Sequence, residues 1–151
     1  MSKILALDLG DHWIGTAISD TTRIIARPFQ TITLKDLSSF LATTLTTERI
    51  GIVVVGYPKT LKGTHSQQTD IIVAMKQNLE TEFPKVTWVL WDERLTSKQA
   101  HAMASTKKNK NKHGAENKNK LHSVAAALIL ESYLLHLEIQ SNKEKLELFD
   151  E

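Results

Sequence analysis

The chain has 151 residues, of which 41% are hydrophobic and 24% charged, so it has apolar material for one folded core and is not expected to be disordered throughout. Nineteen Lys and Arg against seventeen Asp and Glu give a formal net charge of +2, which indicates no particular partner. The absence of cysteine excludes disulfides, thiolate catalysis and iron–sulfur ligation. The apolar runs are too short for a membrane span, and the N-terminus lacks a secretion signal. We therefore expect a soluble, cytoplasmic protein.

The N-terminal part predicts three strands. Residues 3–9, 14–19 and 24–33 are rich in aliphatic and β-branched side chains, although Pro28 weakens the third strand. The connections between them are short, which favours an antiparallel meander.

The middle of the chain alternates helices with apolar strands. Helical spacing of apolar residues predicts a helix over 36–46 and another that carries Ile71, Ile72, Met75 and Leu79 on one side. Residues 50–55 and 86–91 are expected to be strands, and the first has the continuous apolar character of a parallel strand covered on both faces. Capping-box patterns at residues 64–67 and 96–99 predict the start of the second helix and of a short helix that ends near residue 104.

The last third begins with a basic segment. Residues 106–120 contain six lysines and four asparagines with Glu116 as the single acidic residue, so we predict a flexible loop. A helix over 121–137 follows, with Leu121, Val124, Leu128 and Leu135 along one stripe. The acidic, amphipathic tail over 141–151 is expected to be a frayed terminal helix. The pattern predicts one α/β domain over 1–140, with a mixed sheet and packed helices.

Three places carry residues suited to chemistry. Asp8 ends an apolar strand, where a carboxylate is costly to bury unless it is paired or bound to a cation; the alternatives are a turn aspartate and a metal or phosphate site. Asp92 and Glu93 end another strand on opposite faces, so at most one of them joins Asp8, unless both belong to a solvated strand end. His122 shares a helix side with Ala125, Ala126 and Ile129, as a packed histidine or as a ligand.

The lysines of the basic segment also have two interpretations. They either make the chain soluble or contact a phosphate backbone, and their density next to a candidate site suits the second role. They are Lys107, Lys108, Lys110, Lys112, Lys118 and Lys120.

Four stretches, taken in order, resemble the YqgF/RuvX family, a group of Holliday-junction-resolvase-like proteins regarded as pre-16S rRNA nucleases. Each stretch alone is a weak signal, whereas the ordered set with the basic segment before the last stretch is specific and spans nearly the whole chain. The stretches are LALDLG with IGTAISD (5–10 and 14–20), VVVGYP with Gly63, Thr64 and Gln67 (53–58), WDERLT (91–96), and VAAALIL with Tyr133 and Leu134 (124–130).

The resemblance implies an RNase H-like fold, with a five-stranded sheet of three antiparallel and then parallel strands and helices on both faces. It implies a cleft in which Asp8 and Glu93 hold Mg²⁺ or Mn²⁺ for phosphodiester hydrolysis. His122 stands where the family usually has an aspartate, and a histidine there suits Mn²⁺ or proton transfer. Asp11, His12 and Trp13 stand where a basic residue is common, so Trp13 either stacks on a base or packs internally.

Three functions from different classes are compatible with these residues. The first is a nuclease that processes the 5′ end of precursor 16S rRNA in ribosome biogenesis, with a resolvase of branched DNA as its close alternative. The second is a nucleic-acid-binding protein in which His122 has impaired cleavage. The third is an ATPase of the actin and sugar-kinase superfamily, which starts with a similar strand–Asp-x-Gly–strand pattern but needs two such domains. We favour the first.

Overall fold

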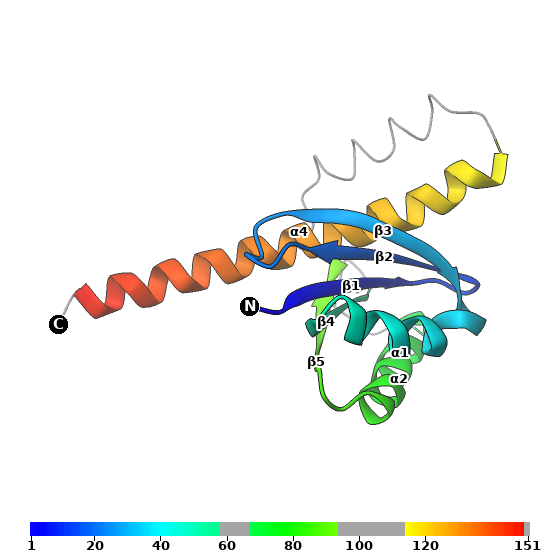
Figure 1. Ribbon diagram of the computed structural model, residues 1–151, viewed down its shortest axis with the longest axis horizontal. Coiled ribbons are helices and arrows are strands. Elements are labelled where there is room, and N and C mark those ends of the chain that lie inside the picture. The colour runs from blue at the N-terminus through cyan, green and yellow to red at the C-terminus, as the bar shows by residue number, and fades with distance from the viewer. Residues whose placement is uncertain (58–66, 94–113, 150–151) are drawn as a thin grey trace.

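The computed structural model describes residues 1–57, 67–93 and 114–149, which form a five-stranded sheet with helices on both faces (Figure 1). The strand order across the sheet is β3-β2-β1-β4-β5. The strands are β1 (Lys3–Leu9), β2 (Trp13–Ser19), β3 (Ala26–Thr33), β4 (Ile50–Tyr57) and β5 (Thr87–Asp92).

The strand directions confirm the predicted mixed sheet. β1 pairs antiparallel with β2, and β2 pairs antiparallel with β3. β4 lies parallel to β1 on its other side and parallel to β5. The central strand β1 is therefore hydrogen-bonded along both edges, and helices cover both of its faces, which explains its run of aliphatic residues.

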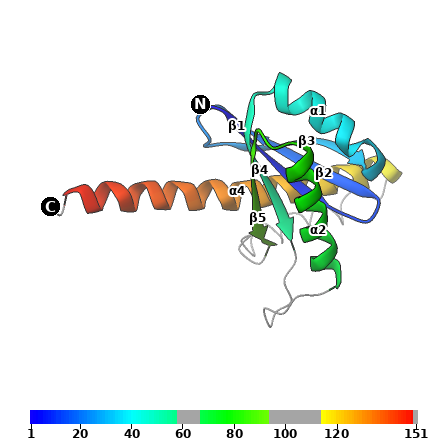
Figure 2. The same ribbon diagram turned by 90° about the horizontal axis from the view of Figure 1, so that it is seen from below.

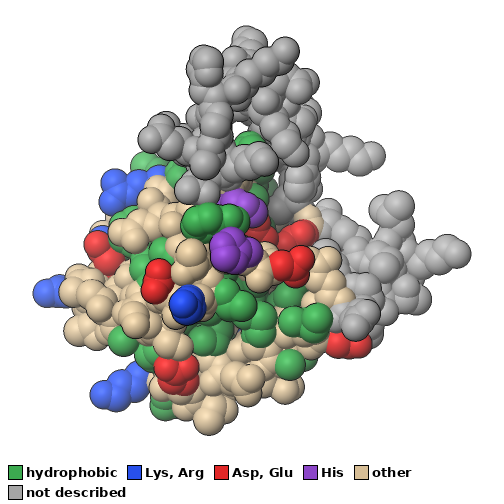
Figure 3. All heavy atoms as spheres, turned by 90° about the vertical axis from the view of Figure 1, so that its right-hand side faces the viewer, with side chains coloured by type: hydrophobic (Ala, Val, Ile, Leu, Met, Phe, Trp, Pro, Cys, Tyr) green, Lys and Arg blue, Asp and Glu red, His purple; other side chains and the backbone are tan. Residues whose placement is uncertain are grey.

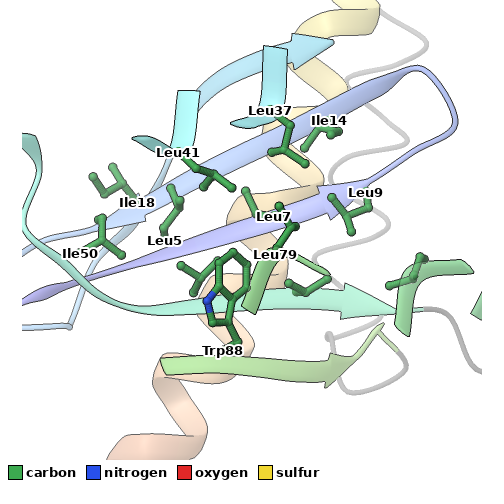
Figure 4. Close-up of a cluster of buried hydrophobic side chains, with 13 residues drawn as sticks. Leu5, Leu7, Leu9, Ile14, Ile18, Leu37, Leu41, Ile50, Leu79 and Trp88 are labelled. Atoms are coloured by element: carbon green, nitrogen blue, oxygen red, sulfur yellow. The ribbon is translucent and has the colours of Figure 1, made fainter. Parts of the chain in front are cut away.

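One face of the sheet is covered by α1 (Leu37–Thr47) and α2 (Gln67–Glu82), and a short 3-10 helix (Leu34–Asp36) precedes α1. Leu5 and Leu7 of β1 pack there with Leu41 of α1, Leu79 of α2 and Trp88 of β5 (Figure 4).

The other face is covered by α4 (Gly114–Phe149), which crosses the sheet and extends beyond it (Figure 2). Ile4 and Ala6 of β1 pack there against Ala126 and Leu130. Successive residues of β1 thus alternate between two hydrophobic cores, and the residue parity of Ile4 and Ala6 places Asp8 on the α4 face.

Two helix faces differ from the predicted ones. In α2, Ile72 and Leu79 are buried but Ile71 is exposed, because adjacent residues lie about 100° apart around a helix. In α4 the predicted stripe is not the buried one: Leu135 is exposed, and Leu121, Val124 and Leu128 are half-buried. The sheet instead contacts a side of α4 that carries small alanines, which let the helix approach the sheet closely. The buried residues on this side are Ser123, Ala126, Ala127, Ile129, Leu130, Tyr133 and Leu134.

The third strand is shorter than predicted, since Ile24 and Ile25 are exposed and precede it. The Asp20 carboxylate accepts hydrogen bonds from the backbone N–H groups of both residues at 2.9 and 2.8 Å and from the Thr22 hydroxyl. These bonds hold a turn at the point where the sequence pattern predicted a strand, and they lower the pKa of Asp20.

The basic segment differs in part from the prediction, whereas the helix expected after residue 141 is present. Residues 114–120 belong to α4, and the same helix continues to Phe149. Once a helix is anchored on a core, each further residue adds one hydrogen bond without a new nucleation cost, so polar Lys, Glu and Asn residues can extend it at both ends. Residues 106–113, 64–66 and 96–104, for which a loop and helix starts were predicted, lie outside the described residues. No helix among those described has the length and apolar character needed to cross a bilayer.

Candidate functional site

Asp8 lies between two glycines in the middle of the sheet. Its cross-strand neighbours are Gly15 on β2 and Gly56 on β4. Side chains directly opposite one another on neighbouring strands share a face, so the missing side chains leave the space beside the Asp8 carboxyl free of cross-strand Cβ atoms. Glycine inside a strand often marks such a close approach by another group. Here two groups approach, α4 over Gly15 and Glu93 over Gly56.

At Gly15 the approaching group is the α4 backbone. A Cβ atom built on Gly15 would lie 1.8 Å from the His122 carbonyl oxygen and 2.8 Å from the Ser123 nitrogen, both shorter than any van der Waals contact. The helix therefore passes directly over this glycine. This close contact brings His122 to the strand pair that carries Asp8.

At Gly56 the approaching groups are side chains. A Cβ atom built there would lie 2.4 Å from Ile129 Cδ1 and 3.3 Å from Glu93 Oε1. Gly56 thus leaves room for the carboxyl group of Glu93 above the strand next to Asp8.

Glu93 directly follows β5, and its face was predicted correctly. Val89 and Trp91 pack in the core beneath α4, whereas Trp88 and Leu90 pack in the opposite core. The strand end is tied to α4, because Trp91 Nε1 donates a hydrogen bond to Ser132 Oγ at 3.2 Å and the indole meets the Tyr133 ring edge-to-face at 5.3 Å. These contacts hold the strand end from which Glu93 reaches Asp8.

The Asp8 and Glu93 side chains are hydrogen-bonded to each other. Burial, the charge of Asp8, the hydrogen bond to it and the charge of Asp92 together raise the pKa of Glu93 to about 7. Burial also raises the pKa of Asp8, although the nearby His122 and the hydrogen bond with Glu93 oppose the increase. Two carboxyl groups can share a hydrogen bond only if one is protonated, so the pair holds one proton between them.

The three predicted site residues are therefore not equally close. Asp8 and Glu93 are in contact, and His122 is near enough for its charge to act on Asp8. Within residues 1–57, 67–93 and 114–149, no three His, Asp or Glu side chains form a ready-made group of metal ligands. The site in this structure is a carboxylic acid–carboxylate pair with an imidazole beside it.

The other predicted residues lie on several elements. Trp13 is half-buried and meets the ring of the exposed His12 edge-to-face at 5.0 Å, which is compatible with packing and with base stacking alike. Figure 3 shows histidine and acidic side chains gathered on one face of the molecule, at the end where β1 and β2 are connected. Of the six lysines, Lys118 and Lys120 belong to the first turns of α4, and the other four lie outside the described residues.

The glycines Gly15 and Gly56 were not recognised as site residues from the sequence. The signal was present, because each interrupts an apolar strand and such glycines often mark a close contact. The sequence did not show that both flank the same aspartate, since this depends on the register of three strands.

Sequence comparisons identify the family of the chain. The family model described as RuvX, Holliday junction resolvase, matches residues 2–136. A relative named "Putative pre-16S rRNA nuclease" from Rubrobacter xylanophilus is 34% identical over 132 residues, which cover 87% of this chain and 91% of the relative. A relative of the same name from Amoebophilus asiaticus is 36% identical over 137 residues, with 89% and 94% covered.

Solved structures show the same fold at low sequence identity. RuvC of T. thermophilus, in complex with a Holliday junction substrate, is 14% identical and superposes with a TM-score of 0.57 over 92% of this chain and 96% of its own. The yeast mitochondrial Holliday junction resolvase Ydc2 is 11% identical, with a TM-score of 0.51 over 88% and 78%. The fold is therefore the RNase H-like fold of the RuvC resolvases, as predicted. Together with the family match over most of its length, these similarities show that the chain belongs to the RuvX family.

Proposed function

We propose that this protein is a metal-dependent nuclease that hydrolyses phosphodiester bonds in structured RNA, with the 5′ end of precursor 16S rRNA as its substrate. The observation that carries the proposal is the Asp8–Glu93 pair, a contact between two half-buried carboxyl groups in a space that two glycines leave open. A fold gains little from two half-buried carboxyl groups in contact unless another group binds them. The names of the curated relatives support RNA as the substrate.

The donor set fits a divalent cation. Two carboxyl groups offer the oxygen ligands that Mg²⁺ and Mn²⁺ prefer, and their shared proton is the one that a cation would displace. Asp8 and Glu93 would hold the ion, with His122 as a third ligand or as a proton acceptor. When bound, such an ion activates water and stabilises the negative charge of the leaving oxygen.

The protein side chains then have distinct roles. Asp8 lies on the central strand β1 and would be the fixed ligand, and Glu93, directly after β5, would complete the site. His122 would orient the attacking water or take up its proton, since the imidazole lies near the pair. The lysines between residues 107 and 120 would bind the phosphate backbone.

The test is cleavage of structured RNA by wild type, Asp8→Asn and His122→Asp in Mg²⁺ and in Mn²⁺. We expect no cleavage by Asp8→Asn. We expect His122→Asp to cleave faster in Mg²⁺, because a carboxylate binds Mg²⁺ better than an imidazole does. Binding without cleavage by wild type under both metals would contradict a nuclease and support the impaired binding protein.

Branched DNA is the second candidate substrate. The family description and the RuvC structure with a Holliday junction substrate favour it. Running the same variants on a four-way junction separates the two, since the proposal requires faster cleavage of the RNA. The family match argues against the ATPase alternative.

Neutralising the basic segment tests the role of its lysines. Replacing Lys107, Lys108, Lys110 and Lys112 by Gln should weaken RNA binding, most strongly at low salt. Each lost phosphate contact lowers the slope of log affinity against log salt by about 0.7 to 0.9. Lys35→Gln with Lys85→Gln, two exposed lysines elsewhere, is the control. If the slope of log affinity against log salt is unchanged in the variant, the lysines do not contact phosphate and serve only to make the chain soluble.

A further inference from the structure

The C-terminal part of α4 projects beyond the sheet. Figures 1 and 2 both show this half of the helix pointing away from the rest of the molecule, and every residue from 138 to 149 is exposed. The family match ends at residue 136, so this extension is an addition to the part that defines the family. The extension therefore contributes nothing to the sheet or to the carboxyl pair.

The extension carries an exposed apolar stripe. Leu135, Ile139, Leu146 and Phe149 are 56%, 47%, 65% and 87% exposed. With Asn142 between them, the positions follow one another at steps of 4, 3, 4 and 3 residues. This is the a/d spacing of a heptad repeat, which forms the seam of coiled coils. Leu148, which is 76% exposed, is the large apolar residue of the extension that lies off this line.

The stripe faces away from the sheet. The residues of α4 that contact the sheet include Leu130, Tyr133 and Leu134. At about 100° per residue, Ile139 and Leu146 lie on the opposite side of the helix. A second helix can therefore pack along the stripe while the sheet domain stays on the outer side.

We propose that this stripe pairs with the same stripe of a second copy of the chain, as a parallel two-stranded coiled coil. The charges beside the stripe select this partner and this direction. Glu138 and Lys143 occupy flanking g and e positions, and in a parallel pair Glu138 of each copy faces Lys143 of the other. An antiparallel pair with the same apolar contacts would instead bring Lys143 beside Lys143 and Lys145 beside Lys145, which is repulsive.

Asn142 supports the same arrangement. In a parallel pair without axial shift, the two Asn142 amides face each other within the seam and can hydrogen bond. Any shift would place an amide against an apolar side chain. A single polar residue in an apolar seam is a known device that sets register and lowers stability, so we expect a dimer that dissociates on dilution.

The first experiment is sedimentation of the full chain over a range of concentrations. Wild type should approach twice the chain mass of 17.0 kDa as concentration rises. Leu146→Glu should remain a monomer at each concentration at which wild type is dimeric. Leu148→Glu is the matched control and should dimerise like wild type, because Leu148 is also exposed (76%) but lies on the opposite side of the same turn.

Two further variants test direction. Glu138→Lys should dissociate the dimer, and adding Lys143→Glu should restore it, a rescue that loss of helicity alone would not give. Because the chain has no cysteine, Asn142→Cys should form a disulfide-linked dimer on oxidation, whereas Leu148→Cys should not. A monomeric wild type at all concentrations, equal effects at Leu146 and Leu148, or no rescue would overturn the proposal. None of these outcomes depends on nuclease activity.

Discussion

Asp8→Asn and Glu93→Gln are expected to abolish cleavage and, in the absence of metal, to stabilise the folded protein at pH 8. The Glu93 pKa is raised from 4.5 to about 7 in the folded state, first by burial and then by Asp8. Between these two pH values the folded state holds a proton that the unfolded state has released. Stability is therefore greatest below pH 4.5 for this group and is lost as the pH rises through 7.

The amide variants remove the charge that causes this loss. After allowance for partial exposure to solvent, we expect a gain of about 1–2 kcal/mol at pH 8 and a smaller one at pH 5. Urea unfolding in EDTA at the two pH values measures the change. Glu144→Gln, on the exposed extension, is the control and should alter neither stability nor cleavage. A lower stability of both variants at pH 8 would show that the carboxyl pair holds the fold together instead of serving a ligand.

Gly15→Ala is expected to destabilise the fold by about 3 kcal/mol or more. The added methyl group would overlap the His122 carbonyl and the Ser123 nitrogen, which are backbone atoms of a long helix and cannot turn aside. The helix would have to move off the sheet, which costs packing in the whole α4 core. The move would also carry His122 away from Asp8, so we expect cleavage to fall even at temperatures where the variant is folded.

Gly56→Ala provides the matched comparison. Its nearest obstacle is Cδ1 of Ile129 at 2.4 Å, the end of a flexible side chain, and Glu93 Oε1 at 3.3 Å would have to give by a few tenths of an ångström. We expect a cost of about 1 kcal/mol, since a rotamer change can relieve the overlap. Urea unfolding of the two variants side by side measures the difference. Equal costs would show that α4 is not held against β2 as closely as the structure indicates.

Which segments form strands and which form helices could be predicted well from the local sequence pattern. Apolar runs such as residues 3–9 and 50–57 have few alternatives to a buried strand. Alternation placed Asp92 and Glu93 on opposite faces of their strand, and the family resemblance selected Glu93. Local pattern failed where two signals competed. At Ile24 and Ile25 the β-branched side chains favoured a strand, but the Asp20 carboxylate held their N–H groups in a turn.

The buried face of α4 was predicted wrongly for a different reason. The helix is apolar on two sides, and periodicity alone selected the side with the larger residues, including Leu128 and Leu135. The sheet packs instead against Ala126 and Ala127. These small side chains, together with Gly15 on the strand, let the helix backbone lie close to the sheet. The side with Leu128 and Leu135 therefore faces away from the sheet. Its continuation toward the C-terminus is the exposed stripe from which we infer a coiled-coil dimer.

The residue types of the site, two carboxylates and a histidine on separate elements, could be read from the chain together with its family resemblance. Their meeting was implied by the family resemblance and not by the residues themselves, since it depends on the strand register that sets Asp8 between Gly15 and Gly56. The shared proton of Asp8 and Glu93 also had no signal in the chain. It arises because folding removes both carboxyl groups from water and brings them into contact, and burial and proximity are properties of the folded molecule alone.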